Sequence, residues 1–241
     1  MILLFTDFGV AGPYQGELRA ALLRTAPEVP VVDLMADAPS FRPDLAVYLL
    51  AALADTAQMG DVLLAVVDPG VGGDRAPLAL RVDGRWLVGP DNGLFEFVLR
   101  RGRTVAPFEI VWRPDRLSAS FHGRDLFAPV AARLARGDRA GLVAATPTRF
   151  GDWPDDLPAV VHVDRYGNAV TGLRAAHLPP GSGLAVAGRR LPSARTFGDV
   201  PRGEPFWYGN SSGLVEIAAN AADAATLLGL APGSPVEVRT A

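Results

Sequence analysis

The sequence contains no cysteine and no lysine. Without cysteine the chain can form no disulfide, no thiolate metal site and no cysteine nucleophile. Without lysine it has neither a Schiff-base residue nor the phosphate-binding lysine of a P-loop. Histidine is scarce as well, with only His122, His162 and His177, so a histidine-rich metal site is not expected. We therefore expect neither a resident metal nor a cofactor.

A strong excess of one charge and long apolar runs are also missing. The net charge is −3, with 49% hydrophobic and 20% charged residues, which is ordinary for a globular protein. No large basic surface for nucleic acid is expected. No apolar run approaches ~18 residues, so we expect no membrane span and no membrane partner. The first nine residues lack a basic segment and predict a strand rather than a signal peptide, which favours a cytoplasmic protein.

The first 150 residues alternate between strand and helix patterns. Short apolar runs predict strands, and apolar residues three and four positions apart predict helices. This alternation predicts an α/β domain in which a mostly parallel sheet lies between helices. The predicted strands are 2–6, 29–35, 62–68 and two within 78–90, and the predicted helices are 12–27, 42–56, 92–102 and 127–137.

The pattern changes after about residue 150. Residues 149–158 are rich in proline and aspartate and predict a linker. Short strand-like runs with glycine and asparagine turns follow, and only residues 223–230 have the pattern of a helix. We expect a smaller, mainly β domain with a barrel-like or sandwich-like fold. The expected domains are residues 1–150 and 155–241.

Acidic residues lie where three predicted strands end. Asp7 follows the first strand, Asp33 lies within the second, and Asp68 follows the third. Ligands of parallel sheets bind beyond the carboxyl ends of the strands, so Asp7 and Asp68 are candidates for one shared site. Capping of a turn or helix would also explain each acid. The glycine-rich loop of residues 68–75 is a weak signal for phosphate binding, and a plain turn explains its glycines equally well.

Polar residues in four further loops could contribute to a site. His122 lies between Phe121 and Gly123, just before a predicted helix, although a single histidine is more often structural. Asn92 has the position of a helix N-cap, which alone would explain it. Residues 164–168 and 208–213 combine an aromatic residue with asparagine and glycine, as ordinary turns or as a surface for a planar heterocycle.

Six motifs occur together in an order that resembles one protein family. The chain is similar to the S-adenosyl-L-methionine hydroxide adenosyltransferases, the hydrolytic relatives of fluorinases and chlorinases. The resemblance runs from residue 2 to the C-terminus. Its motifs are TDFG at 6–9, DPGVG with Arg at 68–75, PDNGL at 90–94, FHGRD at 121–125, DRYGN at 164–168 and NSSGLVEIAAN at 210–220.

The resemblance implies a reaction, an assembly and a set of site residues. S-adenosyl-L-methionine and water would give adenosine and L-methionine, in a homotrimer whose sites lie between subunits. The implied catalytic residues are Asp68, Arg75 and His122, and Asp7 would bind the ribose. The implied adenine contacts are Tyr166, Asn168, Phe197 and Ala221, and the implied contacts to the methionine end are Asp164, Ser211 and Ser212. Further substrate-binding positions within the motifs are Asn92, Gly123 and Glu216, and aromatic residues available to line the pocket include Phe8, Phe41 and Phe121.

The residue types suit this chemistry. The leaving group would be a neutral thioether, which needs no proton, whereas the attacking water must lose one. A carboxylate or an imidazole could accept that proton; the sequence leaves open whether Asp68 or His122 does so. The halogenating relatives carry tyrosine in place of Asp68 and of His122, which favours hydrolysis here. One departure is the loop after Gly9, GVAGPY in this chain, where many relatives carry an acid that would make a second sugar contact.

Two other kinds of protein fit part of the same pattern. A nucleotide hydrolase could use Asp7 and Asp68 to hold Mg²⁺, although the absence of lysine speaks against phosphate chemistry. A non-catalytic module could bind adenosine or S-adenosyl-L-methionine, but binding alone does not require Asp68, Arg75 and His122 together.

Overall fold

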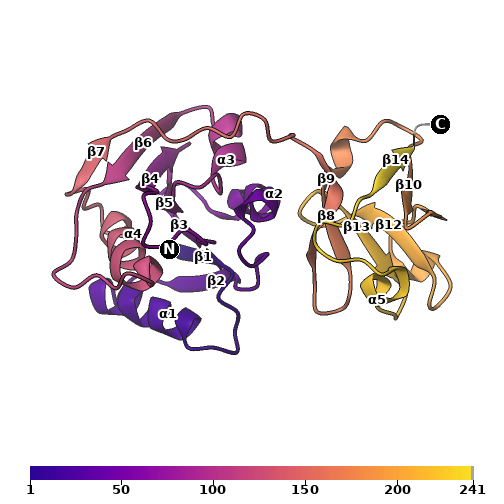
Figure 1. Cartoon of the computed structure of the whole chain (residues 1–241), viewed down its shortest axis with the longest axis horizontal. Coiled ribbons are helices and arrows are strands. Elements are labelled where there is room, and N and C mark those ends of the chain that lie inside the picture. Colours follow the sequence, from indigo (N-terminus) through magenta and orange to yellow (C-terminus); the bar gives the residue numbers. More distant parts are fainter. Residues whose placement is uncertain (240–241) are drawn as a thin grey trace. The chain divides into compact units, whose positions relative to one another are not determined.

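The computed structural model describes residues 1–239. The chain divides into two compact units, an N-terminal unit of Met1–Gly151 and a C-terminal unit that begins at Asp152 (Figure 1). Each unit is described separately below.

A seven-stranded sheet forms the centre of the N-terminal unit, in the order β2-β1-β3-β5-β4-β6-β7. Strands β2, β1, β3, β5 and β6 run one way, and β4 and β7 run the other. The predicted α/β class is confirmed. The strands are β1 (Ile2–Thr6), β2 (Val31–Met35), β3 (Val62–Val66), β4 (Pro77–Val82), β5 (Arg85–Pro90), β6 (Val105–Ile110) and β7 (Leu142–Ala144).

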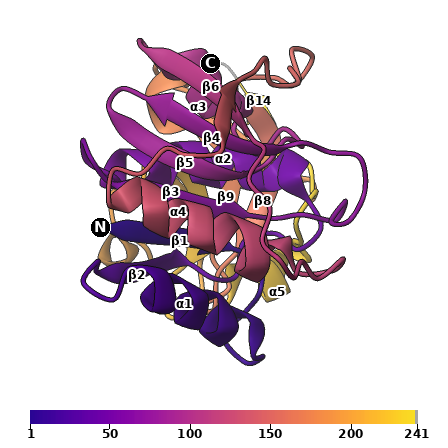
Figure 2. The same ribbon diagram turned by 90° about the vertical axis from the view of Figure 1, so that its left-hand side faces the viewer.

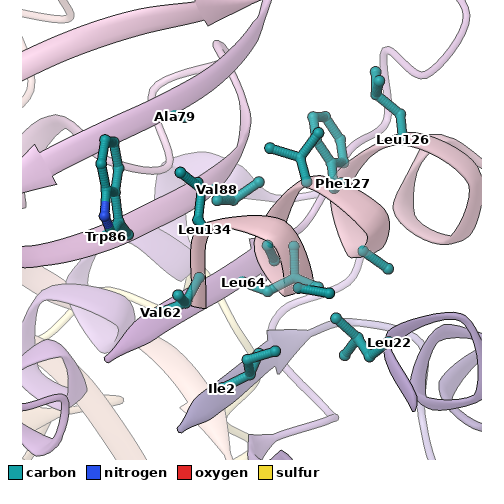
Figure 3. Packing of buried hydrophobic residues seen from close by; sticks show 14 of the residues in the cluster. Ile2, Leu22, Val62, Leu64, Ala79, Trp86, Val88, Leu126, Phe127 and Leu134 are labelled. Atoms are coloured by element: carbon teal, nitrogen blue, oxygen red, sulfur yellow. The ribbon is translucent and has the colours of Figure 1, made fainter. Parts of the chain in front are cut away.

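Helices cover both faces of this sheet. Figure 2 shows α1 (Tyr14–Thr25) and α4 (Ala128–Ala135) side by side across the near face. The other two helices, α2 (Pro43–Leu53) and α3 (Glu96–Arg101), pack against each other on the opposite side. The centroids of the Tyr48 and Phe97 rings lie 4.7 Å apart there. Alternate strand residues point to opposite faces, so one set of side chains from β1, β3 and β5 packs under α1 and α4. Figure 3 shows this core, with Ile2, Leu64, Val88, Leu22 and Leu134 among its buried members.

The predicted position of Asn92 as a helix N-cap is wrong. Helix α3 begins at Glu96 and its N-cap residue is Phe95. The preceding Gly93 has a φ of +93°, outside the right-handed helical region, so residues 92–95 form a turn. The Asn92 amide instead donates to the Val67 carbonyl oxygen at 2.8 Å and fixes the backbone just before Asp68.

Glu96 fastens the end of the N-terminal unit to helix α3. Its side chain is fully buried and accepts hydrogen bonds from Arg100, Arg149 and the Phe150 amide. Burial opposes ionisation of this carboxyl, but the two arginines and the amide outweigh it and lower its pKa to about 2. The buried, ionised Glu96 side chain thus holds the segment of Arg149 and Phe150, at the end of the N-terminal unit, against helix α3.

Two antiparallel sheets build the C-terminal unit, in the orders β12-β13-β9-β8 and β11-β10-β14. They share a core to which both contribute, including Val160, Ile217, Leu184 and Leu191. The predicted helix near 223–230 is confirmed as α5 (Ala224–Leu228), with Asp223 as its N-cap and left-handed Gly229 at its end. The strands are β8 (Leu157–Val163), β9 (Ala169–Arg174), β10 (Gly183–Val186), β11 (Arg189–Leu191), β12 (Pro205–Gly209), β13 (Leu214–Ala219) and β14 (Glu237–Arg239).

Within residues 1–239, none of the helices has both the length and the hydropathy needed to cross a membrane.

Candidate active site

Asp7 and Asp68 lie at the same edge of the N-terminal sheet. Strands β1 and β3 are neighbouring parallel strands in which Thr6 pairs with Val66, so the residues that follow them emerge together. Both aspartates line one cavity of about 530 Å³, named here the N-terminal cavity. Burial raises the pKa of the Asp7 carboxyl; the Phe41 amide, which donates to it at 3.2 Å, opposes this, and the nearby Asp68 charge adds to it.

Asp68 and Arg75 form a two-pronged ion pair. The Arg75 Nε donates to Asp68 Oδ1 at 3.0 Å, and Nη2 makes a short contact with Oδ2. The two side chains are only 5% and 10% exposed, so solvent screens the pair weakly. Such a paired geometry fixes the direction of the carboxylate.

The same guanidinium determines the tautomer of His122. Arg75 Nη2 lies 3.0 Å from His122 Nδ1, and because a guanidinium can only donate, Nδ1 must be the acceptor. Burial and the charge of Arg75 lower the pKa of His122, with Asp68 opposing them, so the ring is neutral near pH 7. The proton of a neutral ring then resides on Nε2. His122 lines the N-terminal cavity, and no group within residues 1–239 hydrogen-bonds its Nε2.

The glycines of the Asp68 loop permit close packing of two loops. Gly72 has a φ of +80°, and a Cβ atom there would lie 2.4 Å from the Ala119 carbonyl oxygen. Only glycine combines this backbone conformation with so near an approach. The loop carrying Asp68 and Arg75 thereby rests on the loop that leads to His122. This contact accounts for Gly72 without a phosphate ligand.

Aromatic rings form one wall of the N-terminal cavity. Phe8, Tyr14 and Phe121 contact one another with ring centroids 5.4–6.2 Å apart. Gly123 follows His122 at the start of a π-helix, and a Cβ atom there would lie 3.1 Å from the Phe8 ring. Phe41 also lines the cavity with its side chain largely exposed and with a φ of 62°, a strained value for a non-glycine residue.

The C-terminal unit contains a second cavity, of about 760 Å³, named here the C-terminal cavity. Asp164 accepts hydrogen bonds from the backbone amides of Tyr166 and Asn168 and from the Asn168 side-chain Nδ2 at 2.9 Å. Left-handed Gly167 allows this tight turn. The turn exposes the Tyr166 ring beside the oriented amide of Asn168.

Glu216 lines the C-terminal cavity. Its Oε1 accepts from the Tyr208 hydroxyl at 2.6 Å and its Oε2 from Asn210 Nδ2 at 2.9 Å. Burial and the Glu216 carboxylate raise the pKa of Tyr208, so this hydroxyl stays a donor. Phe197 and Ala221 also line the cavity, and Ala221 has a left-handed φ of 53°.

Not every expected residue lies in a cavity. Asn92 and Ser212 line neither one; Ser212 donates its backbone amide to the Asn210 side chain. Arg75 lies behind Asp68 rather than on the cavity surface. Asp33 faces helix α1, where it accepts from Gln15 and Arg19.

Several cavity residues were not expected from the sequence. Arg124 and Tyr208 lie within or beside the motifs, which was a usable signal, whereas Glu17 had none. The unexpected polar and aromatic lining residues are Tyr14, Glu17, Ser40, Ser118, Ser120 and Arg124 in the N-terminal cavity and Tyr208 and Asn210 in the C-terminal one.

A group of three or more aspartate, glutamate or histidine side chains suited to a metal ion is not found among residues 1–239.

The N-terminal unit is an α/β unit that carries a cluster of a carboxylate, a guanidinium and an imidazole near its strand ends. The C-terminal unit is a β unit whose cavity is lined by aromatic and amide side chains. Together they define an enzyme-like class of two-unit proteins. Comparison with known proteins identifies the family. The N-terminal and C-terminal domain models of S-adenosyl-L-methionine hydroxide adenosyltransferase match residues 2–143 and 158–237. The chain belongs to this family.

Curated relatives and a solved structure agree with this membership. The chain is 40% identical to an (R)-S-adenosyl-L-methionine hydrolase of Thermus thermophilus, covering 98% of each chain, and 38% identical to one of Salinispora arenicola, covering 97% of this chain and 95% of that one. A fluorinase of Actinopolyspora mzabensis is more distant, at 26% identity over 99% of this chain and 96% of that one. The crystal structure of an uncharacterized conserved protein from Thermotoga maritima has a TM-score of 0.86 at 28% identity, covering 100% of both chains.

Proposed function

We propose that this protein hydrolyses S-adenosyl-L-methionine to adenosine and L-methionine. The observation that carries the proposal is the Asp68–Arg75–His122 cluster at the N-terminal cavity. Membership in the hydroxide adenosyltransferase family and similarity to proteins named hydrolases support the same reaction.

The roles of the three residues follow from their hydrogen bonds. A water oxygen attacks the 5′ carbon of the substrate while the C–S bond breaks and its electron pair remains on sulfur. The thioether leaves neutral and takes no proton. Asp68 accepts the proton of the water, because its carboxylate is the acceptor that Arg75 orients. His122 presents its Nε2–H to the water oxygen and positions it, since its Nδ1 is engaged by Arg75.

The surroundings favour this reaction. An apolar wall formed by Phe8, Phe121 and Tyr14 excludes other water molecules. The sulfonium and the attacking water, which is losing its proton, would therefore react with little bulk solvent around them. Holding the water in line behind the C–S bond adds an orientational effect of up to roughly 7–11 kcal/mol in ideal cases.

Water is favoured over halide as the nucleophile for an electrostatic reason. A halide next to the Asp68 carboxylate, at ~4 Å and an effective dielectric constant of about 20, meets a repulsion of about 4 kcal/mol. Water meets no such repulsion and finds a proton acceptor in the same group.

The residues of the two cavities suit different parts of the substrate. Asp7 would accept hydrogen bonds from ribose hydroxyls. In the C-terminal cavity Tyr166 and Phe197 offer rings for stacking on adenine, and Asn168 can pair with the adenine N6 and N7 edge. Asp164 holds that amide in place and, with Ser211, faces the methionine end.

The relatives' names suggest which sulfonium epimer is consumed. Both curated hydrolases are named for (R)-S-adenosyl-L-methionine. We extend this preference to the present chain; turnover of the separated (R) and (S) sulfonium epimers tests it, and equal turnover contradicts it.

A homotrimer with sites between subunits would join the two kinds of cavity. Large exposed side chains support this assembly: Phe41 beside the N-terminal cavity is 74% exposed and Tyr166 beside the C-terminal cavity is 69% exposed. A neighbouring subunit would cover both. Cytoplasmic location stays an expectation from the sequence.

The decisive experiment is to incubate the purified protein with S-adenosyl-L-methionine and excess EDTA and to follow adenosine and methionine by mass spectrometry. Equal amounts of the two products, unaffected by EDTA, are expected. Binding without product formation would leave a non-catalytic binding module, and loss of activity with EDTA would restore the metal-dependent alternative. A chloride-containing sample must give adenosine rather than 5′-chloro-5′-deoxyadenosine as the main product.

A further inference from the structure

Among residues 1–239, Glu216 differs from the other buried carboxylates in having no positively charged partner. Three acidic residues within residues 1–239 are buried as whole residues, namely Asp61, Glu96 and Glu216, and the side chain of Asp68, which pairs with Arg75, is also only 5% exposed. Asp61 pairs with the N-terminal ammonium group, and Glu96 pairs with two arginines. Glu216, only 7% exposed, accepts hydrogen bonds from neutral groups alone.

The hydrogen bonds around Glu216 fix its direction and leave acceptor capacity unused. The Asn210 Oδ1 accepts from the backbone amides of Ser212 and Leu214, so its Nδ2 must face Glu216. The Tyr208 hydroxyl occupies the other carboxylate oxygen. Each oxygen thus has one donor, although a carboxylate oxygen can accept two. Glu216 is a rigidly held acceptor on the cavity surface.

The rest of the C-terminal cavity provides no compensating charge. Its described lining residues include a second carboxylate, Asp164, but no arginine or histidine. A buried charge without a counter-ion is costly, and a protein normally pairs it. A cavity that keeps two carboxylates and no cation therefore suits a positively charged ligand.

We propose that Glu216 is a specificity-determining residue that makes the C-terminal cavity prefer the positively charged sulfonium substrate to uncharged thioether and nucleoside ligands. This inference rests on the proposed function, because it assigns that cavity to the same substrate. The substrate carries one positive charge overall, whereas adenosine and zwitterionic methionine carry none. Hydrolysis removes the charge that Glu216 attracts, and so the reaction itself weakens binding and frees the site.

Two ligands that the enzyme cannot cleave isolate this effect. Sinefungin carries a protonated amine where S-adenosylhomocysteine carries a neutral thioether, and both share the adenosyl and amino-acid ends. Calorimetry would measure the dissociation constant of each for the wild-type protein and for Glu216→Gln. We expect the wild type to bind sinefungin at least about tenfold more tightly. The substitution should weaken sinefungin binding about tenfold, which is about 1.4 kcal/mol, and S-adenosylhomocysteine binding less than about threefold.

Two control variants separate charge from shape. Tyr208→Phe removes a hydrogen bond to Glu216 but keeps its charge, so the preference for sinefungin should persist. Glu204→Gln removes an exposed carboxylate of the same unit, paired with Arg189, and should change neither ligand. Equal weakening of both ligands by Glu216→Gln, or loss of the preference in Tyr208→Phe, would overturn the proposal.

Further readouts keep the proposal and the proposed function apart. Equal affinity of the wild type for the two ligands overturns the charge preference even if Glu216→Gln does not fold. Product formation from S-adenosyl-L-methionine is measured separately on the wild type. A protein that prefers sinefungin through Glu216 but releases no methionine would retain this inference and refute hydrolysis.

Discussion

Arg75 lines neither of the two cavities described above, yet it determines what the two residues beside it can do. By donating to Asp68 and to His122 Nδ1, it leaves the carboxylate as the acceptor and the imidazole as a donor through Nε2. The sequence alone could not distinguish the two as proton acceptors. The answer depends on which imidazole nitrogen faces the guanidinium, and that is a property of the folded loops.

Replacing Asp68 by asparagine should remove the proton acceptor while keeping the size of the side chain. We expect turnover to fall by at least ~10² and substrate affinity to stay within about tenfold. Steady-state kinetics and calorimetry measure the two quantities. Asp33→Asn is the matched control, because Asp33 lies within the neighbouring strand β2 and lines neither cavity, and it should leave turnover nearly unchanged. Wild-type turnover in Asp68→Asn would exclude Asp68 as the base.

The protonation of His122 should make turnover fall at low pH, which gives the pH–rate profile an acid limb. Its pKa lies below the ordinary value of about 6.5. The neutral form of the His122 ring therefore predominates at pH values above its pKa, and turnover should be independent of pH in that range. Below it, protonated Nδ1 can no longer accept from Arg75, and the rate should fall. Turnover measured from pH 4.5 to 8 tests this, and His122→Asn, which lacks a titrating ring, should abolish this fall in rate. A limb centred above pH 6.5 would contradict the neutral-ring assignment.

Among the structural elements, the contact between the Asp68 loop and the His122 loop depends on Gly72. Alanine at this position would place its Cβ against the Ala119 carbonyl and separate Arg75 from His122. We expect Gly72→Ala to reduce turnover at least tenfold, with strain of roughly 1–3 kcal/mol. Gly137→Ala is the control, because Gly137 has a similar φ of +84° but nothing within 4 Å of its Cβ position. If Gly72→Ala and Gly137→Ala lowered turnover equally, backbone strain rather than the contact between the two loops would be the cause.

The anchor at Glu96 should make stability depend on pH. A carboxyl with a folded-state pKa of about 2, against an ordinary 4.5, contributes roughly 3 kcal/mol above pH 4.5 and loses this as the pH falls towards 2. Glu96→Gln should lower the free energy of unfolding by about that amount at pH 7, and by less than half as much at pH 3. Urea titrations at both values measure it. Glu28→Gln, which breaks an exposed pair with Arg136, should change stability little at either pH.

The elements that could be predicted from the sequence are those with strong apolar patterns. Buried runs such as Val62–Val66 specify strands regardless of their surroundings. Strands β6 and β7 were not predicted, since partly exposed residues and Pro107 weaken their pattern and pairing at the sheet edge creates them. Helix α3 was predicted too long, because periodicity does not report the positive φ of Gly93.

The candidate site could be predicted only as far as its motifs reach. Strand-end geometry brings Asp7 and Asp68 to one edge, as expected. The ion pair of Glu17 with Arg124 at the same cavity joins residues 107 positions apart and has no local signal. The charge imbalance around Glu216 has no local sequence signal either, because it becomes visible only when the burial of the side chains is known.

For the whole molecule, the proposed trimer predicts complementation between inactive variants. If each site takes Asp68 from one subunit and Asn168 from the next, mixed trimers of Asp68→Asn and Asn168→Ala contain some sites with both native residues. Random mixing gives about a quarter of native sites. We expect about that fraction of wild-type turnover after the two variants are unfolded and refolded together. No recovery in mixed trimers would place both residues of each site in one chain.

The division of the two cavities between separately packed units also bears on how such proteins diversify. The residues that would handle the nucleophile lie in two loops of the N-terminal unit, whereas the aromatic and amide groups suited to the nucleoside belong to the C-terminal unit with its own core. Because the two units have separate cores, substitutions in those loops would alter the groups that face the nucleophile and leave the core of the C-terminal unit undisturbed. Recombination between relatives near residue 152 would exchange reaction and recognition as independent modules.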